Sequence, residues 1–167
     1  MPAASAVDRP SVLPAVPFGS PGPSGPEAIE AVSACSLVGV LVTAERGEAA
    51  MGYREMVLNV RNCGTKPYEL RGRPEIVVLD EEGLPLKISV VASTHYTPPP
   101  KRLVLKPGTG AMSVLSWRNT VTSVSGASDT GVSLVVAVTA GGKRQLVSLP
   151  STLDLGNTGR LEASTWF

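Results

Sequence analysis

Turn residues recur at short and nearly even intervals from residue 35 onward, and this spacing constrains the fold more than any other feature. Short apolar runs are separated by turn sequences such as Asp80-Glu81-Glu82-Gly83, Pro107-Gly108-Thr109-Gly110 and Gly141-Gly142. Runs this short are typical of strands rather than helices. Roughly eight or nine strands with a turn about every 8–12 residues predict an all-β fold, an immunoglobulin-like antiparallel β-sandwich.

Several runs also show the period of two that a half-buried strand requires. In residues 53–61, Met56, Leu58 and Val60 alternate with more polar positions, which places one face of the strand on a core. Residues 84–91 alternate in the same way, but Pro85 cannot donate to a ladder, so we expect an edge there. The other strands are expected at 37–43, 75–79, 102–106, 111–117, 131–139, 143–149 and 160–166.

The first 33 residues have a different composition and predict a disordered, extended tail, with the sandwich domain at 34–167. Residues 1–33 carry seven of the fifteen prolines. Within them, residues 10–18 are more apolar than a solvated linker needs, and proline favours an extended form that can dock on a partner. The alternative is a spacer with no specific partner. The docking side chains would be Val12, Leu13, Val16 and Phe18.

Composition argues against several classes of function. The formal net charge is +1, so no overall field attracts nucleic acid or an anionic membrane surface. No apolar run approaches the length of about 18 residues that a membrane span needs. Two cysteines and one histidine cannot complete a tetrahedral zinc site without carboxylates. We therefore expect no metal, no cofactor, no nucleic acid and no membrane span.

Catalysis has one candidate residue, the single histidine His95. A Ser-His-Asp site would have to use it, with Asp129 or Asp154 as the carboxylate, but the chain has no Gly-x-Ser-x-Gly nucleophile turn. A small hydrolase that depends on His95 stays open as an alternative. We expect a non-catalytic protein, in which His95 is an ordinary loop residue.

The same loop, residues 92–101, offers exposed side chains for a partner. Three prolines, Pro98 to Pro100, stiffen it, and two basic residues follow. A stiff loop that ends in Lys101 or Arg102 suits a protease inhibitor. The alternative is a structural role, in which the polyproline segment only connects the two sheets. The expected loop contacts are His95, Tyr96, Lys101 and Arg102.

Aromatic residues are few, and two of them end the chain. Trp166 and Phe167 either form an exposed apolar patch for a partner or pack in the core. Core burial of at least one is the stronger expectation, and Trp117 at the end of an alternating run is expected in or near the core.

Cys35 has two interpretations. The residues Val32-Ser33-Ala34 before it fit the small-residue pattern that precedes a lipidated cysteine. A working leader also needs an apolar stretch just upstream, and residues 22–30 contain prolines, glycines and two glutamates instead. A cysteine at the edge of a strand is therefore favoured over a lipid anchor.

Several short motifs follow one another from Cys35 onward in a characteristic order. They are Cys35-Ser36-Leu37, Asn62-Cys63-Gly64, Leu70-Arg71-Gly72-Arg73-Pro74, Val77-Val78-Leu79-Asp80 and Leu105-Lys106-Pro107-Gly108 with Ala111. Their order and spacing, over residues 35 to about 165, resemble domain-of-unknown-function family 4232, which occurs in exported proteins and lipoproteins of actinobacteria. The resemblance implies a secreted or surface-attached β-sandwich, with no activity to carry over.

The chain departs from that family in its cysteines. Members often have Pro-Cys after an Asn-Thr-Gly turn, whereas Cys63 lies inside the turn here and Tyr68 follows Pro67. A later cysteine pair is absent. The resemblance implies that the remaining pair has shifted register and that Cys35 bonds Cys63 across the sandwich. The alternative is two free thiols in a cytosolic protein, and an exported domain favours the disulfide.

Taken together, these patterns predict a secreted interaction module whose leader is absent from this sequence. It would join another secreted or cell-surface protein through the apolar tail or an exposed sheet edge, by strand addition. A protease inhibitor acting through Lys101 or Arg102 and a carbohydrate or cell-envelope binding module are the alternatives.

Overall fold

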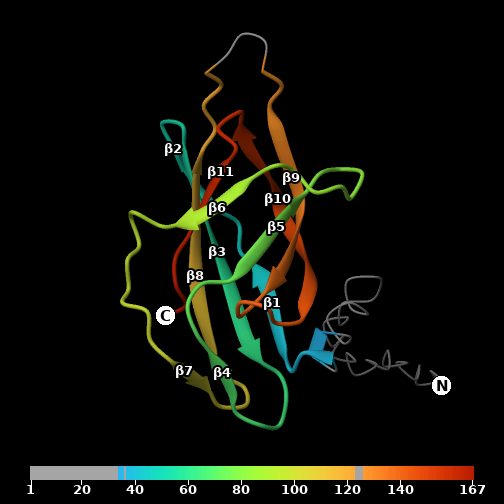
Figure 1. The fold of residues 1–167 in the computed structure, drawn as a ribbon, viewed down its shortest axis with the longest axis vertical. Helices are drawn as coiled ribbons and strands as arrows, with labels where there is room; N and C mark the ends of the chain where they lie inside the picture. The colour runs from blue at the N-terminus through green and yellow to red at the C-terminus, as the bar shows by residue number, and fades with distance from the viewer. Residues whose placement is uncertain (1–33, 36, 123–125) are drawn as a thin grey trace, which may run out of the picture.

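The chain forms eleven β-strands within the residues that the structure describes. This computed structural model describes residues 34–35, 37–122 and 126–167. No helix in this part of the chain has the length and apolar character needed to span a membrane. The strands are β1 (Val40–Ala44), β2 (Glu48–Ala50), β3 (Tyr53–Asn62), β4 (Tyr68–Leu70), β5 (Glu75–Leu79), β6 (Ser89–Ala92), β7 (Leu103–Leu105), β8 (Gly110–Arg118), β9 (Asp129–Ala137), β10 (Arg144–Gly156) and β11 (Arg160–Ala163) (Figure 1).

The larger sheet has six strands. Its order is β1-β3-β8-β11-β6, and β2 pairs with β3 beside this path. The long antiparallel pair of β3 and β8 forms its centre. β1 forms one edge, and β6 forms the other by running parallel to β11. The last strand of the chain therefore joins the edge strand β6 to the centre of the sheet.

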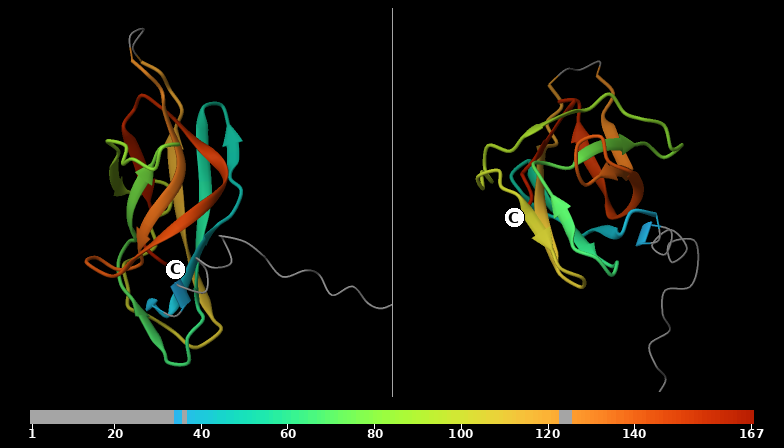
Figure 2. Two further views of the ribbon diagram at one scale, coloured as in Figure 1. Left: turned by 90° about the vertical axis from the view of Figure 1, so that its right-hand side faces the viewer. Right: turned by 60° about the horizontal axis from the view of Figure 1, so that its bottom comes forward.

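A smaller antiparallel sheet of three strands, in the order β10-β9-β5, forms the second layer. The β9–β10 hairpin turns at Gly141, whose φ of +71° is easily adopted only by glycine. β4 and β7 form a separate two-stranded pair at the lower end of the molecule in Figure 1. Figure 2 shows the same arrangement from two further directions.

The core lies between the two layers and is made by alternate residues of each strand. Met56, Leu58 and Val60 of β3 are buried, as their alternation predicts. Trp117 of β8 is buried beside them in the same apolar cluster, also as expected. Alternation thus identified the inward face of the central strand. The predicted fold class, an immunoglobulin-like antiparallel β-sandwich, is confirmed, with the parallel β6–β11 pair as an exception to its antiparallel pairing.

The first strand begins later than the expected residue 37. The main-chain N–H groups of Val38 and Gly39 both donate to the carbonyl oxygen of Ala34, at 2.8 and 3.2 Å. Gly39 has a φ of +87°. The chain therefore makes a turn before it enters β1 at Val40, which apolar composition alone did not reveal.

The expected strand at 84–91 is a regular strand only over β6. Pro85 forms an isolated bridge to Leu79, and the Leu86 N–H donates to the Val78 carbonyl oxygen at 2.9 Å. Because proline has no N–H, no ladder starts at Pro85. The segment first closes the end of β5 and then crosses to the other sheet, where β6 is an edge as expected.

Two short strands were missed, and one strand is longer than expected. β2 is exposed at every position, and β4 has only three residues, so neither carries a clear apolar pattern. β10 continues to Gly156 past a shift of register between Ser148 and Leu153. Pro150 lies inside that shift, where a residue without an N–H is tolerated.

The disulfide between Cys35 and Cys63 is present, with a Cα–Cα distance of 5.7 Å. It joins the turn before β1 to the residue after β3, and these two strands are neighbours in one sheet. The expectation that the bond crosses between the two sheets was therefore wrong. Asn62 shapes the turn, because its buried side-chain amide donates to the carbonyl oxygens of Lys66 and Leu105, both at 2.8 Å.

One side of the sandwich is closed by a glutamine side chain. Gln145 of β10 is 7 % exposed. Its Oε1 accepts from the Val42 N–H of β1 at 2.9 Å, and its Nε2 donates to the Val40 carbonyl oxygen at 3.1 Å. The amide thus satisfies two main-chain groups at the free edge of β1, in the way that another strand would.

Replacing Gln145 with Ala should lower the free energy of unfolding by about 2–4 kcal/mol, because two buried main-chain groups lose their partner. Urea denaturation at pH 7 measures the change. Ser148→Ala, on an exposed position of the same strand, should change stability by less than about 0.5 kcal/mol. Equal stability of the two variants would show that this amide does not hold the sheets together.

Removing the disulfide by the double substitution Cys35→Ser and Cys63→Ser should lower the free energy of unfolding by about 3.6 kcal/mol, the loss expected for a loop of 28 residues. Denaturation of the wild-type protein with and without a reductant is the matched comparison. The reduced wild type and the double variant should unfold at the same denaturant concentration. An unchanged midpoint in both would contradict a stabilising role.

Candidate functional site: an open seam between two sheets

The side of the sandwich opposite Gln145 is formed by the edge strands β5 and β6. Successive residues of a strand direct their main-chain groups to opposite sides. The Val78 carbonyl oxygen accepts from the Leu86 N–H, on the side of β5 that faces away from β9. Ile76 lies two residues earlier in the same strand, so its main-chain N–H and C=O also face away from β9. On β6, the Ser89 N–H donates to the Gly159 carbonyl oxygen, on the side of β11. The next residue, Val90, therefore directs its main-chain N–H and C=O away from β11. Among the described residues, no main-chain partner is found for these groups of Ile76 or Val90.

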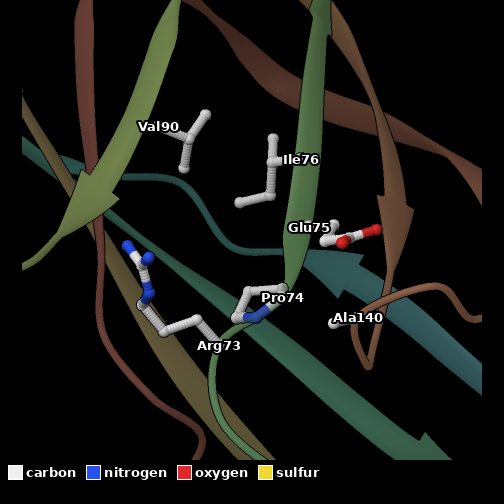
Figure 3. A pocket seen from close by; sticks show the side chains of 6 residues that line it. All are labelled: Arg73, Pro74, Glu75, Ile76, Val90 and Ala140. Carbon is white, nitrogen blue, oxygen red and sulfur yellow. The ribbon is translucent and has the colours of Figure 1, made fainter.

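We call the gap between the facing edges of β5 and β6 the seam. A pocket of about 410 Å³ lies in it. Figure 3 shows the side chain of Val90 from β6 facing that of Ile76 from β5 across the opening. Ile76 is only 8 % exposed, so its side chain forms the apolar floor. The pocket is lined by Arg73, Pro74, Glu75, Ile76, Val90 and Ala140.

The two charged side chains that line the pocket, Glu75 and Arg73, differ in whether they already have a partner. Glu75 is occupied, because its Oε2 accepts from the Gly141 N–H at 3.3 Å and lies 3.9 Å from Arg144 Nη2. Arg73 is half-buried and has no ion pair or hydrogen-bond partner among the residues that are described. Figure 3 shows its guanidinium below Val90. The seam therefore combines unpaired main-chain groups, an apolar floor and one available positive charge.

The predicted loop residues His95 and Tyr96 lie on the outer face of the larger sheet. His95 is exposed, and its ring centroid is 5.0 Å from that of Tyr53. Tyr96 donates its hydroxyl to Glu55 Oε2 at 2.7 Å, which raises the pKa of Tyr96. Neither Asp129 nor Asp154 is bonded to His95: Asp154 binds Arg54, with 3.1 Å between Nη2 and Oδ2. A hydrolytic site on His95 gains no support from this placement.

Lys101 and Arg102 are both exposed. Arg102 is engaged, because its Nη2 lies 2.6 Å from Glu69 Oε2, and Arg71 binds the other oxygen of the same carboxylate at 2.6 Å. Arg102 and then Arg71 hold the pKa of Glu69 at about 2, well below its ordinary 4.5. Arg102 is therefore part of a surface ion network on β4.

The two terminal aromatic residues have different surroundings. Trp166 is 2 % exposed and donates its indole N–H to the Val138 carbonyl oxygen at 2.7 Å, so it belongs to the core. Phe167 is 41 % exposed, and its main chain pairs with Met112. The expected patch is thus reduced to Phe167 beside Met112. The tail residues Val12, Leu13, Val16 and Phe18 lie outside the described residues.

The seam was only partly visible in the sequence. Ile76 and Val90 were expected on strands, and Pro85 indicated an edge nearby. Arg73 appeared only as part of a family motif. β6 faces β5 because β6 pairs with β11 in parallel. The local sequence contains no signal for that pairing. In the described part of the chain, no group of three or more histidine, cysteine or acidic residues is arranged to hold a metal ion.

The fold and the Cys35–Cys63 bond define a disulfide-linked, all-β sandwich domain. Residues 35–167 match the family described as a domain of unknown function, DUF4232, and the chain belongs to this family. The resemblance indicated by the sequence motifs is therefore confirmed. No match to this chain is found among curated proteins.

The Glu69 side chain should titrate near pH 2 in an NMR titration of its carboxyl carbon. Because its pKa is lowered on folding, any stability it contributes is present above pH 4.5 and is lost as pH falls toward 2. Arg102→Ala should return the pKa toward 4.5, and more so than Arg71→Ala, since Arg102 is the larger cause. Arg46→Ala, an exposed control, should leave it unchanged. A wild-type pKa near 4.5 would show that the ion network does not persist in solution.

Proposed function

We propose that this domain is a non-catalytic, secreted interaction module that binds an extended segment of another secreted or cell-surface protein in the seam between β5 and β6. The observation that carries the proposal is the asymmetry of the sandwich. One edge is closed by Gln145, whereas the other presents unpaired main-chain groups on Ile76 and Val90. Unpaired strand edges are the templates on which peptides add as new strands.

The lining of the seam specifies the chemistry of the partner segment. An apolar side chain suits the floor made by Ile76 and Val90. A carboxylate suits Arg73, because a guanidinium binds carboxylates through paired hydrogen bonds. The partner segment should therefore be extended and carry an acidic residue close to an apolar one.

Secretion is part of the proposal and is supported by the disulfide. Bonds such as Cys35–Cys63 form and persist in oxidising compartments and are rare in the cytosol. The N-terminal tail offers a second route to a partner through residues 10–18. Deleting residues 1–30 distinguishes the two routes, because binding at the seam should survive the deletion and binding through the tail should not.

A displayed library of random peptides selected on the immobilised chain tests the seam. Enriched peptides should combine apolar and acidic residues and should perturb the amide NMR signals of Ile76 and Val90. Arg73→Glu should weaken binding at least about tenfold, equal to about 1.4 kcal/mol. Arg46→Glu, the same charge reversal at an exposed site elsewhere, should leave the affinity unchanged.

A proline substitution gives a sharper control of the main-chain contact. Val90→Pro removes an N–H that faces the seam and leaves the bonds of Ser89 and Val91 to β11 in place. The domain should stay folded and lose peptide binding. Peptides that bind Val90→Pro as tightly as the wild type, or whose signals map to another surface, would rule out strand addition here.

A further inference from the structure

A second polar site lies on the outer face of the larger sheet and is independent of the seam. Ser116 of β8 stands directly opposite Glu55 of β3 on one side and Glu162 of β11 on the other. Directly opposite residues share a face, with Cβ atoms about 5 Å apart. The neighbours of Ser116, Leu115 and Trp117, belong to the core. The row Glu55, Ser116 and Glu162 therefore lies on the outer face.

The Ser116 hydroxyl has no hydrogen-bond partner among the described residues. The side chain is fully buried, at 0 % exposed, and its Oγ is the one buried side-chain polar atom in the described ranges that makes no hydrogen bond. Native proteins rarely leave such a group without a partner, and a bound water or ion is a common reason when one does. Ser116 lies between two glutamates in the sheet, and a pair of carboxylates on one face favours a cation.

Each carboxylate is held through one oxygen and keeps the other available. Glu55 Oε2 accepts from the hydroxyls of Tyr96 at 2.7 Å and Tyr53 at 3.4 Å. Glu162 Oε1 accepts from the N–H and hydroxyl of Thr94, at 3.2 and 3.0 Å. No hydrogen bond to Glu55 Oε1 or Glu162 Oε2 is found within the described part of the chain. Such second contacts orient carboxylates for a ligand.

Burial raises the pKa of the Tyr53 phenol, the Ser116 hydroxyl acts in the opposite direction, and the Glu55 and Glu162 carboxylates raise it further. Of the three residues in the row, the Tyr53 hydroxyl is hydrogen-bonded to Glu55, and the Ser116 hydroxyl stays without a hydrogen bond among the described residues.

We propose that Glu55, Ser116 and Glu162 form a binding site for Ca²⁺. The available donors are all oxygens, which favours a hard cation over zinc or copper. Strand side chains of different reach suit the flexible coordination of Ca²⁺ better than the strict octahedron of Mg²⁺.

Two positive groups moderate the expected affinity. Arg160 Nη2 lies 3.7 Å from Glu162 Oε1, and Arg118 Cζ lies 5.9 Å from the centre of the Tyr53 ring. Their positive charges offset the negative charges of the two carboxylates. Because Ser116 is 0 % exposed, an ion reaches its hydroxyl only when a covering side chain moves. We therefore expect a dissociation constant of about 1 mM, within the range of extracellular calcium modules.

Thermal unfolding of the full chain tests the site with CaCl₂ as the probe. At 10 mM CaCl₂, the melting temperature should rise by about 4 °C over NaCl of equal ionic strength, as a 1 mM site predicts for a domain of this size. MgCl₂ should give a smaller rise. Glu162→Gln should abolish the calcium shift, and Glu82→Gln, a carboxylate in an exposed turn, should keep it.

Tb³⁺ luminescence gives a second readout that does not depend on stability. Tb³⁺ replaces Ca²⁺ in oxygen sites, and a nearby tyrosine sensitises its emission. Emission should appear with the wild type, fall when excess Ca²⁺ is added, and be lost in Glu55→Gln, while Ser116→Ala should weaken binding several-fold. The absence of a calcium-specific shift in the wild type would overturn the site. A shift retained in Glu162→Gln, or emission unchanged in Glu55→Gln, would overturn it as well.

Discussion

The need to satisfy main-chain hydrogen bonds at strand edges shapes this domain more than any other constraint. A sandwich of two open sheets has free edges on two sides, and each edge exposes donors and acceptors. On one side, Gln145 of the smaller sheet fills the place of a missing strand by bonding Val40 and Val42 of the larger sheet. On the other side, no contact of this kind among the described residues joins Ile76 to Val90. Closure of one edge by Gln145 should stabilise the domain, and the open edge is the one to which we assign the proposed binding.

Long-range contacts fix two further parts of the larger sheet. The disulfide and the Asn62 turn fix the end of the larger sheet where β1 and β3 meet. The loop after β6 is tied to the C-terminal segment, since Thr165 Oγ1 donates to the Pro98 carbonyl oxygen at 3.0 Å. The same loop carries Tyr96, whose hydroxyl donates to Glu55 Oε2 at 2.7 Å. The seam and the proposed calcium site differ in chemistry, because one offers a guanidinium and the other offers carboxylates.

Predictions from local pattern succeeded where the pattern reflects burial and failed where main-chain bonding decided the outcome. The expected range 75–79 is β5 as observed, and the inward residues of β3 follow their alternation. Residues 37–39 are as apolar as a strand but form a turn, because Gly39 adopts a positive φ and the Ala34 carbonyl accepts two hydrogen bonds. The segment 84–88 alternates as a strand does, yet Pro85 prevents it from forming a continuous ladder.

The sequence by itself determined the all-β class and the inward face of the main strands, and the family resemblance favoured the pairing of Cys35 with Cys63 over two free thiols. These features depend on turn residues, on a period of two and on motifs that are local in the chain. Only the tertiary structure decided that Gln145 would close one edge, that Arg73 would stand beside Val90, and that Ser116 would lie between Glu55 and Glu162. Those contacts join strands far apart in the sequence, and pairing at such separations depends on how whole sheets pack rather than on any local pattern.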